Sequence, residues 1–226
     1  MSYPKIISAS DSALIVYFGD TISYDLHKKV LTFTSYLINN PKNDIINIHP
    51  AYNSVMISVD PFSRLSKIQE YINTIIEDFD NMEIINEGSE VIIPVVYGGE
   101  YGPDLDKVAK HCDLSIEEVI KKHSNKDYLV YFIGFSIGFP YLGGMSSSLA
   151  TPRLETPRTI VPKGSIAIAG SQTGIYPLSS PGGWNLIGQT PSHIFNVDNP
   201  KESKLKMGDV IRFKSISAEQ FKDTSL

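Results

Sequence analysis

The sequence has little of what marks a secreted protein. Its 226 residues include a single cysteine, Cys112, so an internal disulfide is impossible. The first 20 residues hold one lysine and a short apolar run followed by acids, without the cleavable apolar segment of a secretory signal. Together these absences predict a cytoplasmic protein.

The chain also lacks a long unbroken hydrophobic stretch. Its longest uncharged run, residues 128–152, is interrupted by glycines, a proline and three consecutive serines. This composition predicts a buried strand followed by a structured loop rather than a membrane span. The net charge of −5 disfavours nonspecific binding to nucleic acid. We therefore expect neither a membrane nor a nucleic acid as partner.

Sequence patterns for metals and nucleotides are missing as well. The five histidines show no HxxxH or HxH spacing, so we expect no metal site. His111 and Cys112 are neighbours on a predicted helix and point about 100° apart, which makes them neither a dyad nor a chelate. Neither GxxxxGK[ST] nor GxGxxG occurs. The glycines in residues 97–104 admit two interpretations, an anion site at a helix start or a tight connection capped by Asp104, and the second is favoured.

Residues 1–86 predict an N-terminal domain that contains both helices and strands. Ser23 is positioned to cap the first helix, and a second helix starts near Ser63. The expected strands are residues 12–18, 45–48, 55–59 and 91–96. The order βαββαβ is typical of a ferredoxin-like domain, in which two helices cover one face of a four-stranded sheet. The last of these strands fits either domain.

Residues 87–226 predict a second domain that is mostly β. Two short helices are expected within residues 104–124, the second opened by a capping box from Ser115 to Glu118. Beyond Tyr128 the helix signals vanish, and the expected strands include residues 129–133, 166–169, 194–197 and 210–213. The fold class is therefore α+β, with an all-β barrel or sandwich at the C-terminal end.

Function is expected in residues 149–191, where prolines and glycines alternate with cations and the only tryptophan. Such backbone is rigid and irregular, so it loses little entropy on binding a ligand. The surrounding residues 145–215 carry 8 Lys/Arg against 4 Asp/Glu, the reverse of the rest of the chain. This charge pattern favours an anionic ligand or an acidic partner surface.

Three cations of this segment stand at spacings of five, each beside a proline: Arg153, Arg158 and Lys163. Arginine is the natural bidentate partner of a carboxylate or phosphate, and lysine is a compact point charge for the same task. Solvated surface charge is the alternative, which the pinned backbone disfavours.

Aromatic side chains and glycines outline a candidate cleft. Two interpretations remain open for it, an apolar wall facing a ligand or a core strand leading into a turn; for the tryptophan these become a lid or a core anchor. The candidate residues are Phe135, Phe139, Tyr141, Gly182, Gly183 and Trp184.

Four blocks of the sequence resemble the signature blocks of the PxpB family, the B subunits of 5-oxoprolinase, whose members are also named KipI-like sporulation kinase inhibitor or allophanate hydrolase subunit 1. The blocks are PVVYGGEYGPDLDKVA, YFIGFSIGFPYLGGM, LATPRLETPRTIVPKGSIAIAGSQTGIYP and SPGGWNLIGQTP. The resemblance covers nearly the whole chain, with one departure, Ile137 in place of the usual proline. It implies an N-terminal α/β domain followed by a C-terminal cyclophilin-like β-barrel.

The resemblance also implies an activity, the ATP-dependent opening of 5-oxo-L-proline to L-glutamate in a complex with two further 5-oxoprolinase components, PxpC and PxpA. ATP with Mg²⁺ is then expected at the level of the complex, and no catalytic residue is identified. Arg153, Arg158 and Lys163 suit a clamp for the substrate carboxylate, whereas Gln172 and Tyr176 suit polar orientation.

A binding module is the competing hypothesis. The name KipI-like implies docking on a sensor histidine kinase and a block of its autophosphorylation. The cleft of Phe135, Phe139 and Tyr141 would then receive a segment of the kinase.

Overall fold

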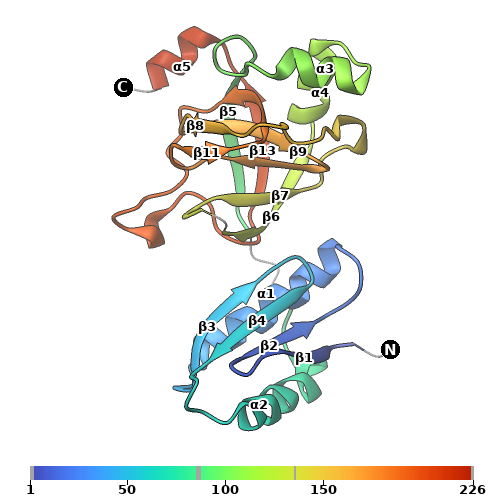
Figure 1. Ribbon diagram of the computed structural model, residues 1–226, viewed down its shortest axis with the longest axis vertical. Helices are drawn as coiled ribbons and strands as arrows, with labels where there is room; N and C mark the ends of the chain where they lie inside the picture. Colours follow the sequence, from blue (N-terminus) through green and yellow to red (C-terminus); the bar gives the residue numbers. More distant parts are fainter. Residues whose placement is uncertain (1–2, 85–87, 135, 225–226) are drawn as a thin grey trace. The chain divides into compact units, whose positions relative to one another are not determined.

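The computed structural model describes residues 3–84, 88–134 and 136–224. The chain divides into two compact units, Met1–Glu87 and Gly88–Leu226 (Figure 1). The expected boundary between residues 86 and 87 lies outside the described residues. None of the described helices has the length and apolar character needed to cross a bilayer.

The N-terminal unit is built on a four-stranded antiparallel sheet with the strand order β1-β2-β4-β3. Its elements are β1 (Lys5–Ser10), β2 (Ala13–Tyr17), α1 (Tyr24–Asn39), β3 (Ile45–Pro50), β4 (Ser54–Val59), α2 (Leu65–Glu77) and the 3-10 turn η1 (Phe79–Asn81).

Both helices cover the same face of this sheet. Alternate strand residues such as Val16 and Ile57 form one buried cluster with Phe33 of α1 and Ile72 of α2. The predicted helix cap is confirmed, since Leu26 N–H donates to Ser23 Oγ at 3.2 Å. The helical spacing of apolar residues thus predicts which faces are buried.

The α+β class is confirmed. The predicted strand that fitted either domain belongs to the barrel. Residues 91–96 lie in β5 (Glu90–Tyr97), which pairs with strands of the C-terminal unit. The fourth strand of the N-terminal sheet is β1, which is mostly exposed and therefore lacks the apolar run that marks a buried strand.

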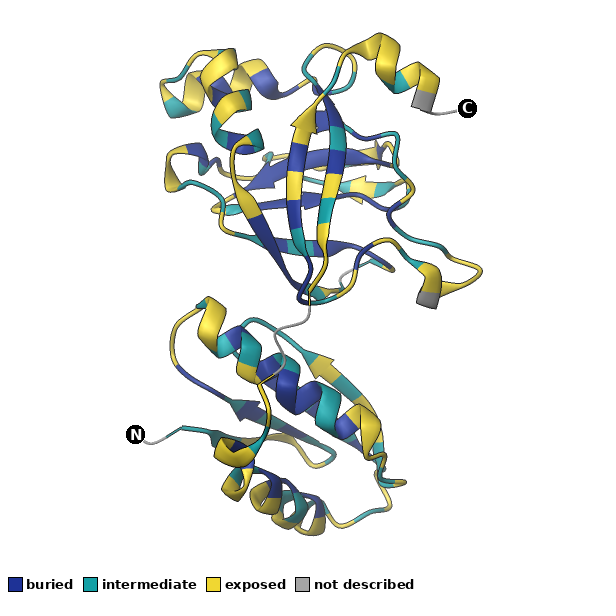
Figure 2. Cartoon of the chain, turned by 180° about the vertical axis from the view of Figure 1, so that it is seen from behind, coloured by how far each residue is buried: buried dark blue, intermediate teal, exposed yellow. Residues whose placement is uncertain are grey.

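The C-terminal unit is a closed seven-stranded barrel with the order β10-β7-β6-β13-β5-β12-β9. β5 runs parallel to β13, and the other neighbouring strands of the described barrel pair antiparallel. Figure 2, which views the chain from behind, shows buried and exposed residues alternating along the barrel strands that face the reader. The remaining barrel strands are β6 (Asp127–Ile133), β7 (Pro140–Gly143), β9 (Ser165–Ala169), β10 (Gln172–Ile175), β12 (Asn185–Gln189) and β13 (Val210–Ser215).

Helices and a two-stranded ribbon surround the barrel. Leu105 of α3 and Val119 of α4 belong to the barrel's own buried cluster, so these helices pack directly on it. The predicted capping box is confirmed, with Ser115 and Glu118 bonded reciprocally. The added elements are α3 (Leu105–Cys112), α4 (Ile116–Ser124), α5 (Ala218–Thr224), the ribbon β8 (Arg158–Val161) with β11 (Ser180–Gly182), and the 3-10 turns η2 (Ser147–Leu149) and η3 (Pro200–Glu202).

One predicted strand is wrong. Residues 194–197 form a loop, in which Asn196 N–H donates to Ser203 Oγ and Lys204 N–H donates to the Ile194 carbonyl oxygen. Ile194 is nevertheless buried in the barrel cluster. The apolar pattern at this position therefore reflects core packing and not a strand.

A fully buried histidine, His123, lies in the barrel core near the end of α4. His123 Nδ1 lies 2.8 Å from the Tyr97 hydroxyl oxygen, and Nε2 lies 2.9 Å from Thr173 Oγ1. Because the Thr173 hydroxyl donates to the Ala167 carbonyl oxygen, it accepts from Nε2–H, and the Tyr97 hydroxyl donates to Nδ1. The ring is therefore neutral, and burial lowers the pKa of His123 to about 3.

We predict that His123 makes the barrel sensitive to acid. Its pKa rises from about 3 in the folded barrel to 6.5 in the unfolded chain, so the unfolded chain binds the extra proton between these pH values. This contribution to the free energy of unfolding is complete above pH 6.5 and falls at lower pH by up to about 1.4 kcal/mol per pH unit. Urea unfolding at pH 7 and pH 5 measures it, and the fluorescence of Trp184, the only tryptophan, reports on the barrel.

The matched variant is His123→Gln, which cannot gain a proton. We expect it to be less stable at pH 7, because the hydrogen bonds of residue 123 to Tyr97 and Thr173 are disturbed. Between pH 7 and pH 5, however, it should lose about 2 kcal/mol less than the parent. An equal loss in the two proteins would contradict the assignment.

Candidate functional site

The segment of residues 151–157 is fixed to the barrel at several points. Thr151 and Gly170 exchange both backbone hydrogen bonds, and Leu154 N–H donates to the Gly183 carbonyl oxygen at 2.7 Å. The Asn185 side-chain amide donates to the Pro152 carbonyl oxygen at 2.8 Å. These bonds hold the backbone on both sides of residue 153, and the two prolines of the segment restrict it further.

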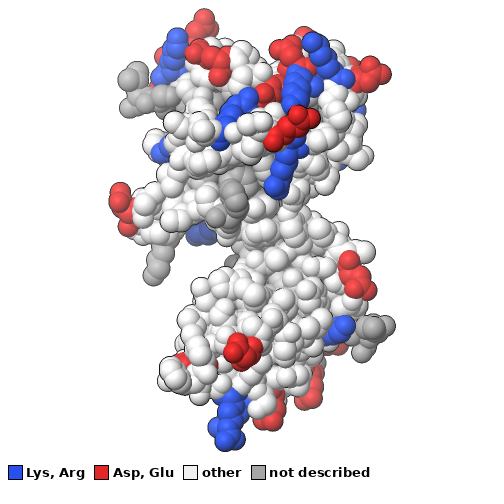
Figure 3. Space-filling view, in the orientation of Figure 1, with Lys and Arg blue, Asp and Glu red and all other residues white. Residues whose placement is uncertain are grey.

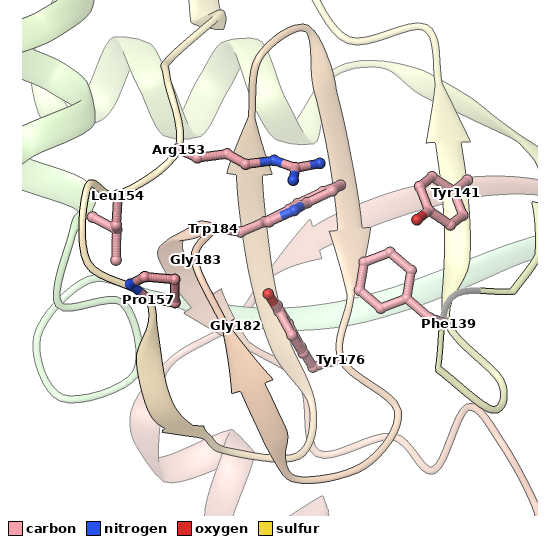
Figure 4. A pocket seen from close by; sticks show the side chains of 9 residues that line it. All are labelled: Phe139, Tyr141, Arg153, Leu154, Pro157, Tyr176, Gly182, Gly183 and Trp184. Atoms are coloured by element: carbon pink, nitrogen blue, oxygen red, sulfur yellow. The ribbon is translucent and has the colours of Figure 1, made fainter.

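The segment forms one wall of a pocket of about 220 Å³, which we call the aromatic pocket. The opposite wall comes from the start of β7, and the floor comes from the turn between β11 and β12 (Figure 4). The lining residues are Phe139, Tyr141, Arg153, Leu154, Pro157, Tyr176, Gly182, Gly183 and Trp184. Most residues of the predicted cleft thus lie together, although Phe135 is outside the described residues.

Phe139 is the centre of the aromatic walls. Its ring meets the rings of Tyr176, Trp184 and Tyr141 edge to face, with centroid distances of 5.3, 5.4 and 5.3 Å. This cluster is separate from the main barrel core and also includes the buried side chain of Leu186. The edge-to-face contacts lock the rings in place, so the pocket exists before a ligand arrives.

Arg153 is the one charged residue among those that line the pocket. Figure 4 shows its side chain extending over the Trp184 ring, and the residue is exposed. Burial raises the pKa values of Tyr141 and Tyr176, with nearby Arg153 opposing the rise in both, so the hydroxyls are protonated at neutral pH. The pocket therefore combines apolar walls, neutral hydroxyl groups and a single guanidinium.

Arg158 does not line the pocket; its guanidinium is bound by a carboxylate of the same chain. Arg158 Nη2 lies 2.7 Å from Asp104 Oδ1, while Asp104 Oδ2 accepts from Leu186 N–H at 2.7 Å. Arg158 also pairs in the ribbon with Gly182. This ion pair thus joins the start of α3, the ribbon and β12 close to the pocket floor.

The prediction for residues 97–104, a tight connection capped by Asp104, is confirmed only in part. The tight connection is confirmed, because Gly102 N–H donates to the Gly98 carbonyl oxygen and Asp104 N–H to that of Leu186. The N–H groups of Gly102 and Asp104 are therefore used inside the chain and are not offered to an anion. The Asp104 side chain, however, makes no capping hydrogen bond. The neighbouring Arg158, which is 54 residues away in sequence, holds it instead.

The other two predicted polar residues lie outside the aromatic pocket. Lys163 Nζ donates to His193 Nδ1 at 2.8 Å and lines a different groove. Gln172 is the first residue of β10 and stands opposite Ala169. No group of three or more His, Cys, Asp or Glu side chains in the described part of the chain is arranged to hold a metal ion.

One sequence pattern needs its structural context. Gly134, Ser136 and Gly138 have the Gly-x-Ser-x-Gly spacing of a hydrolase nucleophile elbow, which stands between a strand and a helix. Here they lie between the antiparallel strands β6 and β7, and Phe139 N–H donates to the Ser136 carbonyl oxygen at 3.1 Å. Gly134, Ser136 and Gly138 thus belong to the connection between two paired strands and do not precede a helix.

Sequence reasoning missed Leu154, Pro157 and Asp104 as parts of the site. The two prolines at positions 152 and 157 are a signal for the first two, since they bracket Arg153. Asp104 offers no such signal, because its partners are distant in sequence.

Comparisons with known proteins agree over nearly the whole chain. The family described as carboxyltransferase domain, subdomain C and D, matches residues 4–205. The 5-oxoprolinase B subunit of Bacillus subtilis (strain 168) is 39% identical, over 96% of this chain and 95% of its own. The same-named protein of Haemophilus influenzae is 38% identical, over 92% of this chain and 96% of its own.

A similar solved structure is that of a longer protein, TTHA0988. It is 33% identical with a TM-score of 0.77 and matches 91% of this chain. Our chain spans 40% of its length.

We predict that Gly182 is required for the shape of the pocket. A Cβ at this position would lie 2.3 Å from the Tyr176 hydroxyl oxygen and 2.8 Å from Tyr176 Cζ, so the buried ring would have to shift. At Gly183 the nearest atom, Pro157 Cγ, is 3.5 Å away, an ordinary contact. Gly182→Ala should therefore cost about 1–3 kcal/mol in unfolding free energy and shift the Trp184 emission.

Gly183→Ala is the matched control and should stay within about 0.5 kcal/mol of the parent. Urea unfolding and fluorescence spectra of both variants make the comparison. Indistinguishable spectra and stabilities would show that the methyl group at position 182 is accommodated.

Proposed function

Because the chain belongs to the PxpB family of 5-oxoprolinase B subunits, as its sequence blocks predict, we propose that its aromatic pocket binds 5-oxo-L-proline. In this proposal the chain acts in a cytoplasmic complex with PxpC and PxpA, which opens the lactam to L-glutamate at the expense of ATP with Mg²⁺. The observation that carries the proposal is the single guanidinium of Arg153 beside the fixed rings of the aromatic pocket.

The dimensions and chemistry of the pocket support this substrate. A volume of about 220 Å³ suits a small metabolite and is below the range usual for drug-sized ligands. The flat ring of 5-oxoproline matches the walls formed by Phe139 and Trp184. Its one carboxylate matches Arg153, which binds carboxylates bidentately. Tyr141 and Tyr176, which stay protonated, offer hydrogen bonds to the lactam carbonyl and N–H groups.

The pocket supports substrate binding better than a complete reaction. A lactam is resonance-stabilised, so phosphoryl transfer from ATP to its carbonyl oxygen, with release of ADP, activates the carbonyl carbon toward water. Water adds to this carbon, the ring C–N bond breaks as the nitrogen takes a proton, and a second water hydrolyses the resulting acyl phosphate to glutamate and phosphate. None of the residues lining the aromatic pocket is a carboxylate, histidine, serine or cysteine that would serve as base or nucleophile. A site completed by another component of the complex explains this composition.

The kinase-inhibitor hypothesis has less support. A docked peptide needs an exposed apolar groove. Phe139 is only 2% exposed and Trp184 only 7%, because the rings pack against each other. These two rings thus offer little apolar surface to a helix or an extended segment of a kinase, whereas a small ring needs much less.

We predict that Arg153→Ala impairs substrate binding without unfolding the barrel. Loss of a charged hydrogen-bonding partner should raise the KM for 5-oxoproline by about 10- to 100-fold, while Arg153→Lys should restore part of it. Release of glutamate and ADP is measured for this chain alone, with PxpC, and with PxpA and PxpC together. We expect turnover only in the mixtures.

Arg158→Ala is the comparison variant. It leaves the Asp104 carboxylate, whose side chain is only 10% exposed, without its cation, so it should lower stability as well as activity. Wild-type mixtures without turnover would refute the proposed function, and a normal KM for 5-oxoproline in Arg153→Ala would refute the role of this residue.

A further inference from the structure

A second groove, of about 430 Å³, adjoins the aromatic pocket. Lys107 and His111 of α3 line one side, and residues 151–156 line the other. We call it the basic groove. It shares Arg153 and Leu154 with the aromatic pocket, so the two spaces meet along one arginine.

The walls of the basic groove are held against each other. Cys112 Sγ at the end of α3 lies 3.6 Å from Thr151 Oγ1 on the opposite wall. Gly102, just before α3, packs so closely on β12 that a Cβ would lie 2.2 Å from the Ile187 carbonyl oxygen. The hydrogen bond from Leu154 to Gly183 fixes the far wall. The groove is thus a defined feature and not an accident of loose loops.

Basic side chains outnumber acidic ones in this groove. Lys107 and His111 are four residues apart on α3 and therefore lie on the same face of the helix. Both are exposed, as is Arg153, and the one acidic residue in the lining is Glu155. Figure 3 shows charged side chains of both signs gathered over the barrel unit in the part where Figure 1 places α3 and α4.

We propose that the basic groove binds the polyphosphate of the ATP that serves the lactam in the aromatic pocket. This inference rests on the proposed function. A nucleotide is too large to share a pocket of about 220 Å³ with a substrate, whereas the adjoining groove leaves room for phosphates. Lys107 holds them as a point charge, His111 donates a ring N–H to them, and Arg153 stands between the two ligands.

Two other grooves with lysines fit the nucleotide less well. The groove on α4 contains Lys121, Lys122 and Lys126, but it shares no lining residue with the aromatic pocket. In the groove beside residues 193–204, Lys163 already donates to His193. Phosphates bound in either would have no connection through a common residue to the substrate.

The test is a pair of kinetic constants, measured on the complete mixture with PxpA and PxpC. Lys107→Ala and His111→Ala should each raise the KM for ATP by about 5- to 10-fold and leave the KM for 5-oxoproline unchanged. Lys110→Ala is the matched control, because Lys110 is an exposed lysine of the same helix that does not line the groove. Trp184 fluorescence of each isolated variant verifies folding.

Three outcomes decide the matter. A selective rise in the KM for ATP, absent in Lys110→Ala, supports the basic groove. If the KM for ATP in Lys107→Ala and His111→Ala equals that of Lys110→Ala, the proposal is overturned. It is also overturned if the KM for ATP rises instead in Lys121→Ala, a variant of the groove on α4. A wild-type mixture without any turnover refutes the proposed function itself, a result distinct from the other two.

Discussion

The attachment of residues 151–157 to the barrel is the constraint on which the rest of the site depends. Three contacts hold it: the bridge between Thr151 and Gly170, the bond from Leu154 to Gly183, and the bond from Asn185 to Pro152. They present Arg153 to the aromatic pocket on one side and leave the basic groove on the other. Without them, an exposed arginine would be a mobile surface charge with little binding value.

The C-terminal unit contains two separate buried clusters, and each has its own role. The main core closes the barrel and contains the neutral His123, whose hydrogen bonds to Tyr97 and Thr173 are hidden from solvent. The smaller aromatic cluster around Phe139 forms the pocket. A rigid barrel thus supports a preformed site, so little ordering entropy is lost when a small ligand binds.

The predicted site residues differ in how local their partners are. Glycines next to aromatic rings in a rigid segment indicated that Phe139, Tyr141 and residues 182–184 lie close together, but left open whether they wall a cleft or pack in the core. Arg153 was predictable from its bracketing prolines. Arg158 has the same local pattern, yet the structure pairs it with Asp104, and Lys163 donates to His193. Composition indicates that a cation is held, but not which group holds it.

The sequence by itself determined the short-range features of this protein. The cap at Ser23, the capping box from Ser115 to Glu118 and the buried helix faces depend on residues within a few positions of each other. The tertiary structure alone decided that β5 pairs with β13, some 120 residues later, and that Asp104 binds Arg158. Such contacts depend on chain closure over long distances, which no local pattern records.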